Sequence, residues 1–85
     1  MNDLSIEEKI ELFEIAAESV DTYEDNRVYS YRSRVRLLLD SIMMFEVEPA
    51  DPGSAIERLE RILELLEMKI KKKQNYQLVM RQTGL

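Results

Sequence analysis

The chain has 85 residues, with 17 acidic against 12 basic side chains and a formal net charge of −5. It contains no histidine, cysteine or tryptophan, so its own side chains cannot form a disulfide, a Cys/His zinc site, a haem ligand pair or a catalytic triad. A chain of this length forms one small domain, residues 1–85, whose core is modest unless a partner chain extends it.

The composition favours a soluble, all-α protein. Hydrophobic residues make up 45% of the chain and charged residues 34%. The two kinds are interspersed, which disfavours both disorder and a membrane span. Glycine and proline are rare, whereas Glu, Leu, Ile, Arg and Lys, which favour helix over strand, are abundant. No basic region followed by an apolar region occurs at the start, so we predict a cytoplasmic protein.

The first helix is predicted over residues 5–23. Ser5-Ile6-Glu7-Glu8 has the spacing of a capping box, in which the serine and the second glutamate each bond the other's backbone amide. Apolar side chains then recur every three or four positions, at Ile6, Ile10, Phe13, Ala17 and Val20. This spacing places them on one face of a helix, which we expect to be buried.

The second helix is predicted over residues 27–46. The same spacing continues there, at Val28, Tyr31, Val35, Leu38, Ile42 and Phe45. We expect these six side chains to face the core. Two prolines and a glycine follow, and because proline disfavours a helical conformation in the residue before it, residues 47–53 are predicted to form a loop.

The third helix is predicted over residues 54–82. Ser54-Ala55-Ile56-Glu57 is a second capping box, and Asp51-Pro52 is an alternative start one turn earlier, with Asp as the N-cap. The apolar face consists of Ile56, Leu59, Leu63, Leu66 and Ile70. The next positions of that face are Lys73, Gln74 and Gln77, so its apolar character ends after Ile70.

Short connections between three helices predict an antiparallel three-helix bundle; the alternative is a long hairpin of the second and third helices with the first laid across it. We favour the bundle. At 1.5 Å per residue, a third helix of about 28 residues is about 42 Å long, whereas the others are about 30 Å long. The end of the third helix is therefore predicted to overhang its neighbours.

The second helix is apolar nearly all round. If its regular row faces the core, Leu37 and Met44 lie on the far side, seven residues apart. Either the second helix is wedged between the other two, or this side meets another chain. Leu65 and Met68 depart from the row of the third helix in the same way. We predict a homodimer whose self-association residues are Leu37, Met44, Leu65, Met68, Tyr76 and Val79.

An acidic row follows the first helix at Glu7, Glu11, Glu14 and Glu18. Three explanations are open: internal pairing with Arg32 and Arg36, binding of a basic protein surface, or imitation of nucleic-acid phosphates. We predict that the row binds a partner protein together with Leu37 and Met44, so that the chain acts as an adaptor, inhibitor or regulator.

A nucleic-acid-binding regulator is the alternative function. Arginines can bind phosphates and the tyrosines among them can stack on bases, although the net charge is opposite to the usual one. The candidate residues are Arg27, Arg32, Arg34, Arg36, Lys71, Lys72 and Lys73. Near the lysines, the apolar part of the chain end is too short to predict membrane binding.

No pattern in the sequence indicates catalysis or a cofactor. There is no Gly-rich phosphate loop and no nucleophile placed with a base, and a metal site of the helical-bundle type would need histidine. We therefore expect a protein that is not an enzyme and that binds neither metal nor cofactor.

Overall fold

Three α-helices make up most of the described chain. The computed structural model describes residues 4–20 and 26–82, with the side chains of these residues except 77 and 79–82. The helices are α1 (Ile6–Ser19), α2 (Arg27–Met43) and α3 (Pro52–Gln82). No strand occurs in the described residues, and the helices pack on one another. The predicted all-α, three-helix bundle is confirmed.

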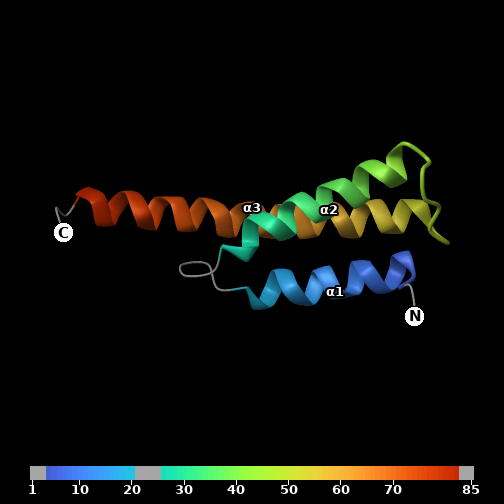
Figure 1. Ribbon diagram of the computed structural model, residues 1–85, viewed down its shortest axis with the longest axis horizontal. Helices are drawn as coiled ribbons and strands as arrows, with labels where there is room; N and C mark the ends of the chain where they lie inside the picture. Colours follow the sequence, from blue (N-terminus) through green and yellow to red (C-terminus); the bar gives the residue numbers. More distant parts are fainter. Residues whose placement is uncertain (1–3, 21–25, 83–85) are drawn as a thin grey trace.

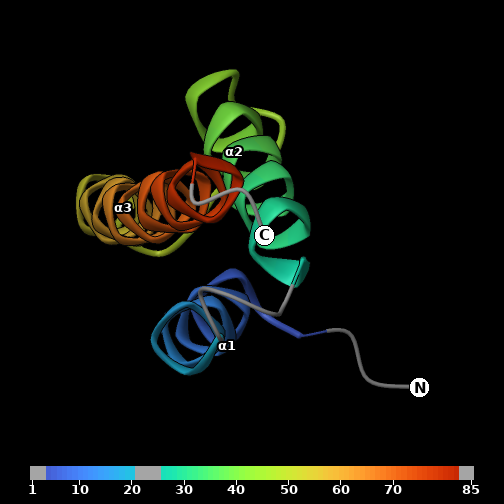
Figure 2. The same ribbon diagram turned by 90° about the vertical axis from the view of Figure 1, so that its left-hand side faces the viewer.

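The longest helix is the one on which the other two pack. Figure 1 shows α1 and α3 running in one direction along the molecule and α2 in the opposite direction. Viewed along the long axis, α1 lies to one side of the α2–α3 pair (Figure 2). The helices α1, α2 and α3 have 14, 17 and 31 residues, so α3 is about 46 Å long and continues past both neighbours (Figure 1).

The start of α1 is the predicted capping box. Ser5 Oγ accepts a hydrogen bond from the Glu8 amide, and a Glu8 carboxylate oxygen accepts one from the Ser5 amide, both at 3.1 Å. The helix ends at Ser19, earlier than predicted, because Val20 takes an extended conformation (φ −65°, ψ 133°) and buries its side chain. Residues 21–23, which were included in the predicted helix, lie outside the described residues.

A side chain from α3 binds the C-terminal end of α1. The Lys69 ammonium donates hydrogen bonds to the backbone carbonyls of Ala17 (2.5 Å), Glu18 (2.9 Å) and Val20 (3.3 Å). The last carbonyls of a helix have no partner within it and form the negative end of its dipole, so a cation is favourable there. Lys69 therefore fixes the end of α1 against α3.

The C-terminal end of α2 is a Schellman motif with phenylalanine where glycine is usual. The Phe45 amide donates to the Ile42 carbonyl (3.1 Å) and the Glu46 amide to the Ser41 carbonyl (2.8 Å), while Phe45 has a φ of 60°. The helix thus ends at Met43, and the predicted end at residue 46 is wrong. The predicted core position of Phe45 is also wrong, because the turn leaves its side chain 89% exposed.

The start of α3 is the alternative predicted at Asp51-Pro52. Asp51 Oδ1 accepts a hydrogen bond from the Ser54 amide at 3.2 Å, and Pro52 is the first helical residue. Proline is favoured there because its missing N–H would have had no partner. The connection between α2 and α3 therefore covers residues 44–51, earlier than the predicted loop, and the capping box at Ser54 does not begin the helix.

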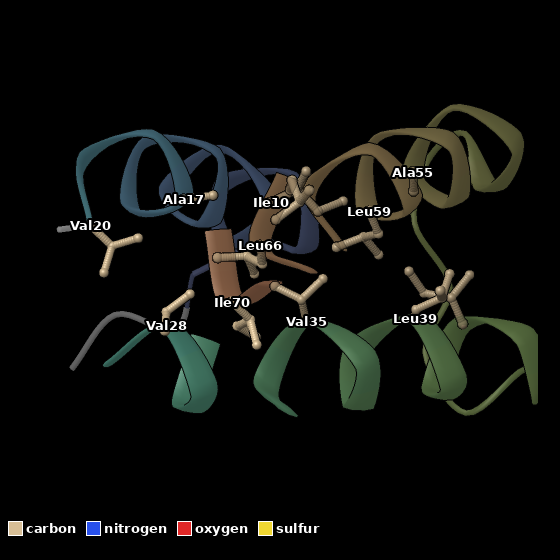
Figure 3. Packing of buried hydrophobic residues seen from close by; sticks show 12 residues of the cluster. Ile10, Ala17, Val20, Val28, Val35, Leu39, Ala55, Leu59, Leu66 and Ile70 are labelled. Atoms are coloured by element: carbon tan, nitrogen blue, oxygen red, sulfur yellow. The ribbon is translucent and has the colours of Figure 1, made fainter. Parts of the chain in front are cut away.

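Apolar side chains from all three helices point toward one another in the core (Figure 3). The buried apolar residues are Ile10, Ala17, Val20, Val28, Val35, Leu39, Ile42, Ala55, Leu59, Ile62, Leu66 and Ile70. Tyr31 and Leu38, predicted for the core, are half-buried and pack against this cluster. Lys73 is only 3% exposed, so burial along α3 continues one turn beyond the predicted end at Ile70.

The positive φ of Phe45 generates a stability prediction. Phe45→Gly should raise the free energy of unfolding by about 1 kcal/mol, because a residue with a Cβ is strained in this conformation and the exposed ring contributes little burial. Phe45→Ala is the matched control, since it removes the ring but keeps the Cβ. Urea denaturation of the three proteins measures the effect. Equal stability of the glycine and alanine variants would contradict it.

The contact between Lys69 and α1 generates a second prediction. Lys69→Met keeps the aliphatic stem but removes the cation, and it should lower the free energy of unfolding by about 1 to 2 kcal/mol. Lys9→Met, at an exposed position of α1, is the control and should change stability by less than about 0.5 kcal/mol. Thermal denaturation compares them. A loss no larger at Lys69 than at Lys9 would exclude a stabilising role for this contact.

Candidate docking surface

The C-terminal end of α2 exposes a cluster of large apolar side chains. Leu37 is 69% exposed, Met44 is 71% exposed, and Met43 and Phe45 beside them are also exposed. Leu37 and Met44 lie two turns apart on the side of α2 that faces away from the buried Val35. We call Leu37, Met43, Met44 and Phe45 the α2-end cluster.

An apolar groove of about 280 Å³ adjoins the α2-end cluster. It lies between the end of α2 and the start of α3 and includes two members of the cluster. Its lining consists of Ile42, Met43, Phe45, Val47, Glu48, Pro49, Pro52 and Ile56. The exposed ring and the groove beside it together offer an apolar side chain of a partner both a contact surface and a recess.

Exposed acidic residues are concentrated in the sequence at this end of the molecule. Asp40, Glu46, Glu48 and Asp51 are exposed, and residues 40–51 contain no basic residue, whereas Arg34 and Arg36 are exposed close to Leu37. We call the four carboxylates the acidic rim. An apolar surface with a rim of one charge favours a partner of the opposite charge. The surface is therefore suited to an apolar segment flanked by lysine or arginine.

The predicted acidic row of α1 is partly engaged within the chain. Glu14 accepts two hydrogen bonds from the Arg58 guanidinium of α3, at 2.5 and 3.1 Å. This hydrogen bonding lowers the pKa of Glu14, against an opposing effect of its burial. Glu7 accepts a hydrogen bond from the Ala50 amide at 3.3 Å. Of the three explanations for the acidic row, internal pairing applies to Glu14. Its basic partner is Arg58 and not the predicted Arg32 or Arg36.

The rest of the acidic row stays exposed on α1. Glu11 and Glu18 have exposed side chains. The outward face beside them carries Leu12 and Ile15, two exposed apolar residues that were not predicted as part of any site. Both residues lie outside the apolar row predicted for this helix. The one signal in the sequence was that large apolar residues occur at positions predicted to face solvent.

The structure divides the predicted self-association residues between two surfaces. Leu37 and Met44 belong to the α2-end cluster, whereas Leu65, Met68 and Tyr76 lie on α3. Leu65 is half-buried and lines a groove between α1 and α3, Met68 is 53% exposed, and Tyr76 is exposed. The side chain of Val79 lies outside the described residues.

The arginines predicted for nucleic-acid binding make contacts within the chain. The Arg32 guanidinium lies over the Tyr29 ring, 6.0 Å from its centroid, and Arg36 pairs with Glu67 of α3 at 3.5 Å. Arg32 and Arg36 share a hollow with the Glu67 carboxylate, which would compete with a phosphate. Arg27 and Arg34 are exposed on α2.

The three lysines of the alternative site differ in exposure. Lys71 and Lys72 are exposed on α3, whereas the neighbouring Lys73 is buried. The buried Lys73 side chain does not present a surface to a nucleic acid, so the alternative site lacks one of its predicted members.

No group of three or more carboxylates is placed to hold a metal ion among the residues that the structure describes. Within the same residues, none of the helices combines the length and the apolar character that crossing a membrane requires.

The Glu14–Arg58 pair generates a pH prediction. Because the folded-state pKa of Glu14 is lowered from its ordinary 4.5, the pair stabilises the fold above that pH and the stabilisation disappears as pH falls through the lowered value. Both side chains are over a third exposed, so screening limits the effect to at most about 1 kcal/mol.

Chemical denaturation of wild type and Glu14→Gln from neutral pH to below pH 4.5 tests this linkage. The wild type should be more stable at neutral pH, and the difference should vanish in acid. In an Arg58→Met background, the same comparison should show no such dependence on pH. An equal pH-dependent difference in both backgrounds would contradict the assignment to Arg58.

Comparison of the chain with protein-family models, with curated proteins and with solved structures gave no match. Its function is therefore inferred from its own residues and their arrangement.

Proposed function

We propose that the chain is a protein-interaction module, without enzymatic activity, that acts as an adaptor, inhibitor or regulator by occupying a surface of a partner protein. The observation that carries this proposal is the α2-end cluster, defined above as Leu37, Met43, Met44 and Phe45, which is exposed beside an apolar groove. Large exposed apolar side chains beside an apolar groove are typical of binding sites in small proteins.

Burial of the α2-end cluster against a partner would contribute favourable free energy to binding. Complete burial of one large apolar side chain contributes about 1.5 to 3 kcal/mol, and binding energy in protein interfaces concentrates in a few such residues. Phe45 is the strongest candidate anchor, because the chain keeps an exposed aromatic ring at a strained position where glycine would relieve the strain.

A basic partner surface fits the charge around the cluster. The exposed rim consists of Asp40, Glu46, Glu48 and Asp51. We assign the attraction of a basic partner to this rim and not to the acidic row predicted on α1, because Glu14 of that row is already paired with Arg58. Charge complementarity of this kind chiefly accelerates association and selects the partner, so binding should weaken at high salt.

A homodimer is also part of the proposal, as the sequence predicts. Leu37 and Met44, which were predicted for its interface, are assigned to the partner-binding surface instead, so the dimer forms through another surface. Its cytoplasmic location stays a prediction from the sequence.

A nucleic-acid-binding regulator is the alternative, and the exposed Arg34, Lys71 and Lys72 support it. The internal contacts of Arg32 and Arg36 and the acidic balance of the chain favour the protein-binding proposal over it.

Affinity capture from the native host tests the proposed function. Tagged wild type should retain a specific protein that Met44→Asp retains at least about tenfold less, because the substitution puts a charge into the apolar contact. Leu12→Asp is the matched control, since it introduces the same charge at an exposed leucine of α1 and should retain the partner.

Equal capture by wild type and both variants would contradict docking through the α2-end cluster. Capture that is lost after nuclease treatment, and lost in Arg32→Glu/Arg34→Glu, would support the nucleic-acid alternative instead.

A further inference from the structure

Four side chains of α3 form a row outside its predicted apolar face. Leu65, Met68, Lys72 and Tyr76 follow one another at spacings of three, four and four residues, which places them on one face of the helix. Leu65 is half-buried, packs against the core and lines the groove between α1 and α3, whereas the other three are exposed. We call these four residues the α3 outer face.

The C-terminal part of α3 extends beyond the other two helices. Lys69 binds the last carbonyls of α1, so α1 ends at the level of Lys69. Ile70 and Lys73 are still buried. Beyond Lys73, α3 continues to Gln82, a further nine residues or about 14 Å, and Figure 1 shows the end of α3 extending past α1 and α2. A helix of this length is marginal in water without packing against a partner.

The charge of α3 changes sign at Met68. Residues 57–67 contain four glutamates and two arginines, whereas residues 69–82 contain five basic residues and no acidic one. Two copies of such a helix attract each other when they lie antiparallel. Side by side in parallel, they would place the lysines of one copy against those of the other.

We propose that two copies of this chain dimerise through α3, antiparallel, around a two-fold axis at Met68. In this register a residue a given number of positions after Met68 lies opposite the residue the same number before it. Lys72 of each copy then lies opposite Glu64 of the other, and both side chains are exposed in the single chain. A two-fold interface makes every such contact twice.

The apolar part of the interface and the acidic part of α1 fit the same arrangement. Met68 of one copy contacts Met68 and Leu65 of the other at the axis. The groove that contains Leu65 is also lined by Glu14 and Glu18 of α1 and by Arg61 of α3, so two carboxylates and one guanidinium border the incoming lysines. This inference rests on the homodimer of the proposed function and gives it a surface and a register, and it leaves the α2-end cluster free for a partner.

Sedimentation equilibrium of the full chain at micromolar concentrations tests the proposal. Wild type should have the mass of a dimer, and Met68→Glu should have the mass of a monomer while keeping the helical circular dichroism, since Met68 is exposed and outside the core. Glu64→Lys and Lys72→Glu should each weaken dimerisation at least about tenfold, because each places two like-charged pairs across the interface.

Mixing the two single-charge variants is the decisive step. Glu64→Lys and Lys72→Glu should form a heterodimer together, since every opposed pair then has opposite charges. Each chain in the mixture carries one substitution, and positions 64 and 72 are eight residues, or about 12 Å, apart in the helix. The restored dimerisation therefore cannot come from a pair within one helix. Glu48→Lys, the same reversal in the α2–α3 loop, is the control and should leave the mass unchanged.

A monomeric wild type at these concentrations would overturn the proposal. So would a mass insensitive to Met68→Glu, or a mixture of the charge variants no heavier than either alone. Met44→Asp should leave the dimer mass unchanged, so failure of the dimer and failure of partner docking give different results.

Discussion

The buried face of α3 is the surface on which the whole fold depends. Both α1 and α2 pack on it, through residues such as Leu59 and Leu66, which are completely buried. Because α3 is about twice as long as either neighbour, the core occupies its N-terminal and middle parts, and the helix continues past the ends of α1 and α2 (Figure 1). The difference in length therefore combines a core shared by three helices with a helix end that extends beyond it.

Cations on α3 determine which acidic groups remain available for binding. Arg58 pairs with Glu14, and Lys69 binds the carbonyls at the end of α1, so part of the negative charge of α1 serves the fold. The loop after α2 contains no basic residue, and its Glu48 lines the same groove as the exposed Phe45. Internal pairing thus engages part of the negative charge of α1, whereas no ion pair within the described residues involves the exposed carboxylates of the loop.

Periodicity and capping rules predicted the parts of the fold that depend on local sequence. The capping box at Ser5, one of the two proposed starts of α3, and most buried positions followed from spacing alone. The end of α2 could not be predicted, because a Schellman turn normally uses glycine and here uses Phe45. The roles of Arg58 and Lys69 depend on which helices become neighbours, and helical spacing carries no information about that.

Amide hydrogen exchange along α3 tests most directly whether this chain has more helical surface than it can cover alone. The expected result is that the amides of residues 74–82 become better protected as the protein concentration rises, while those around Leu66 in the core stay equally protected throughout. Protection of residues 74–82 that does not depend on concentration would contradict the account, because it would mean that no second molecule covers this part of the helix.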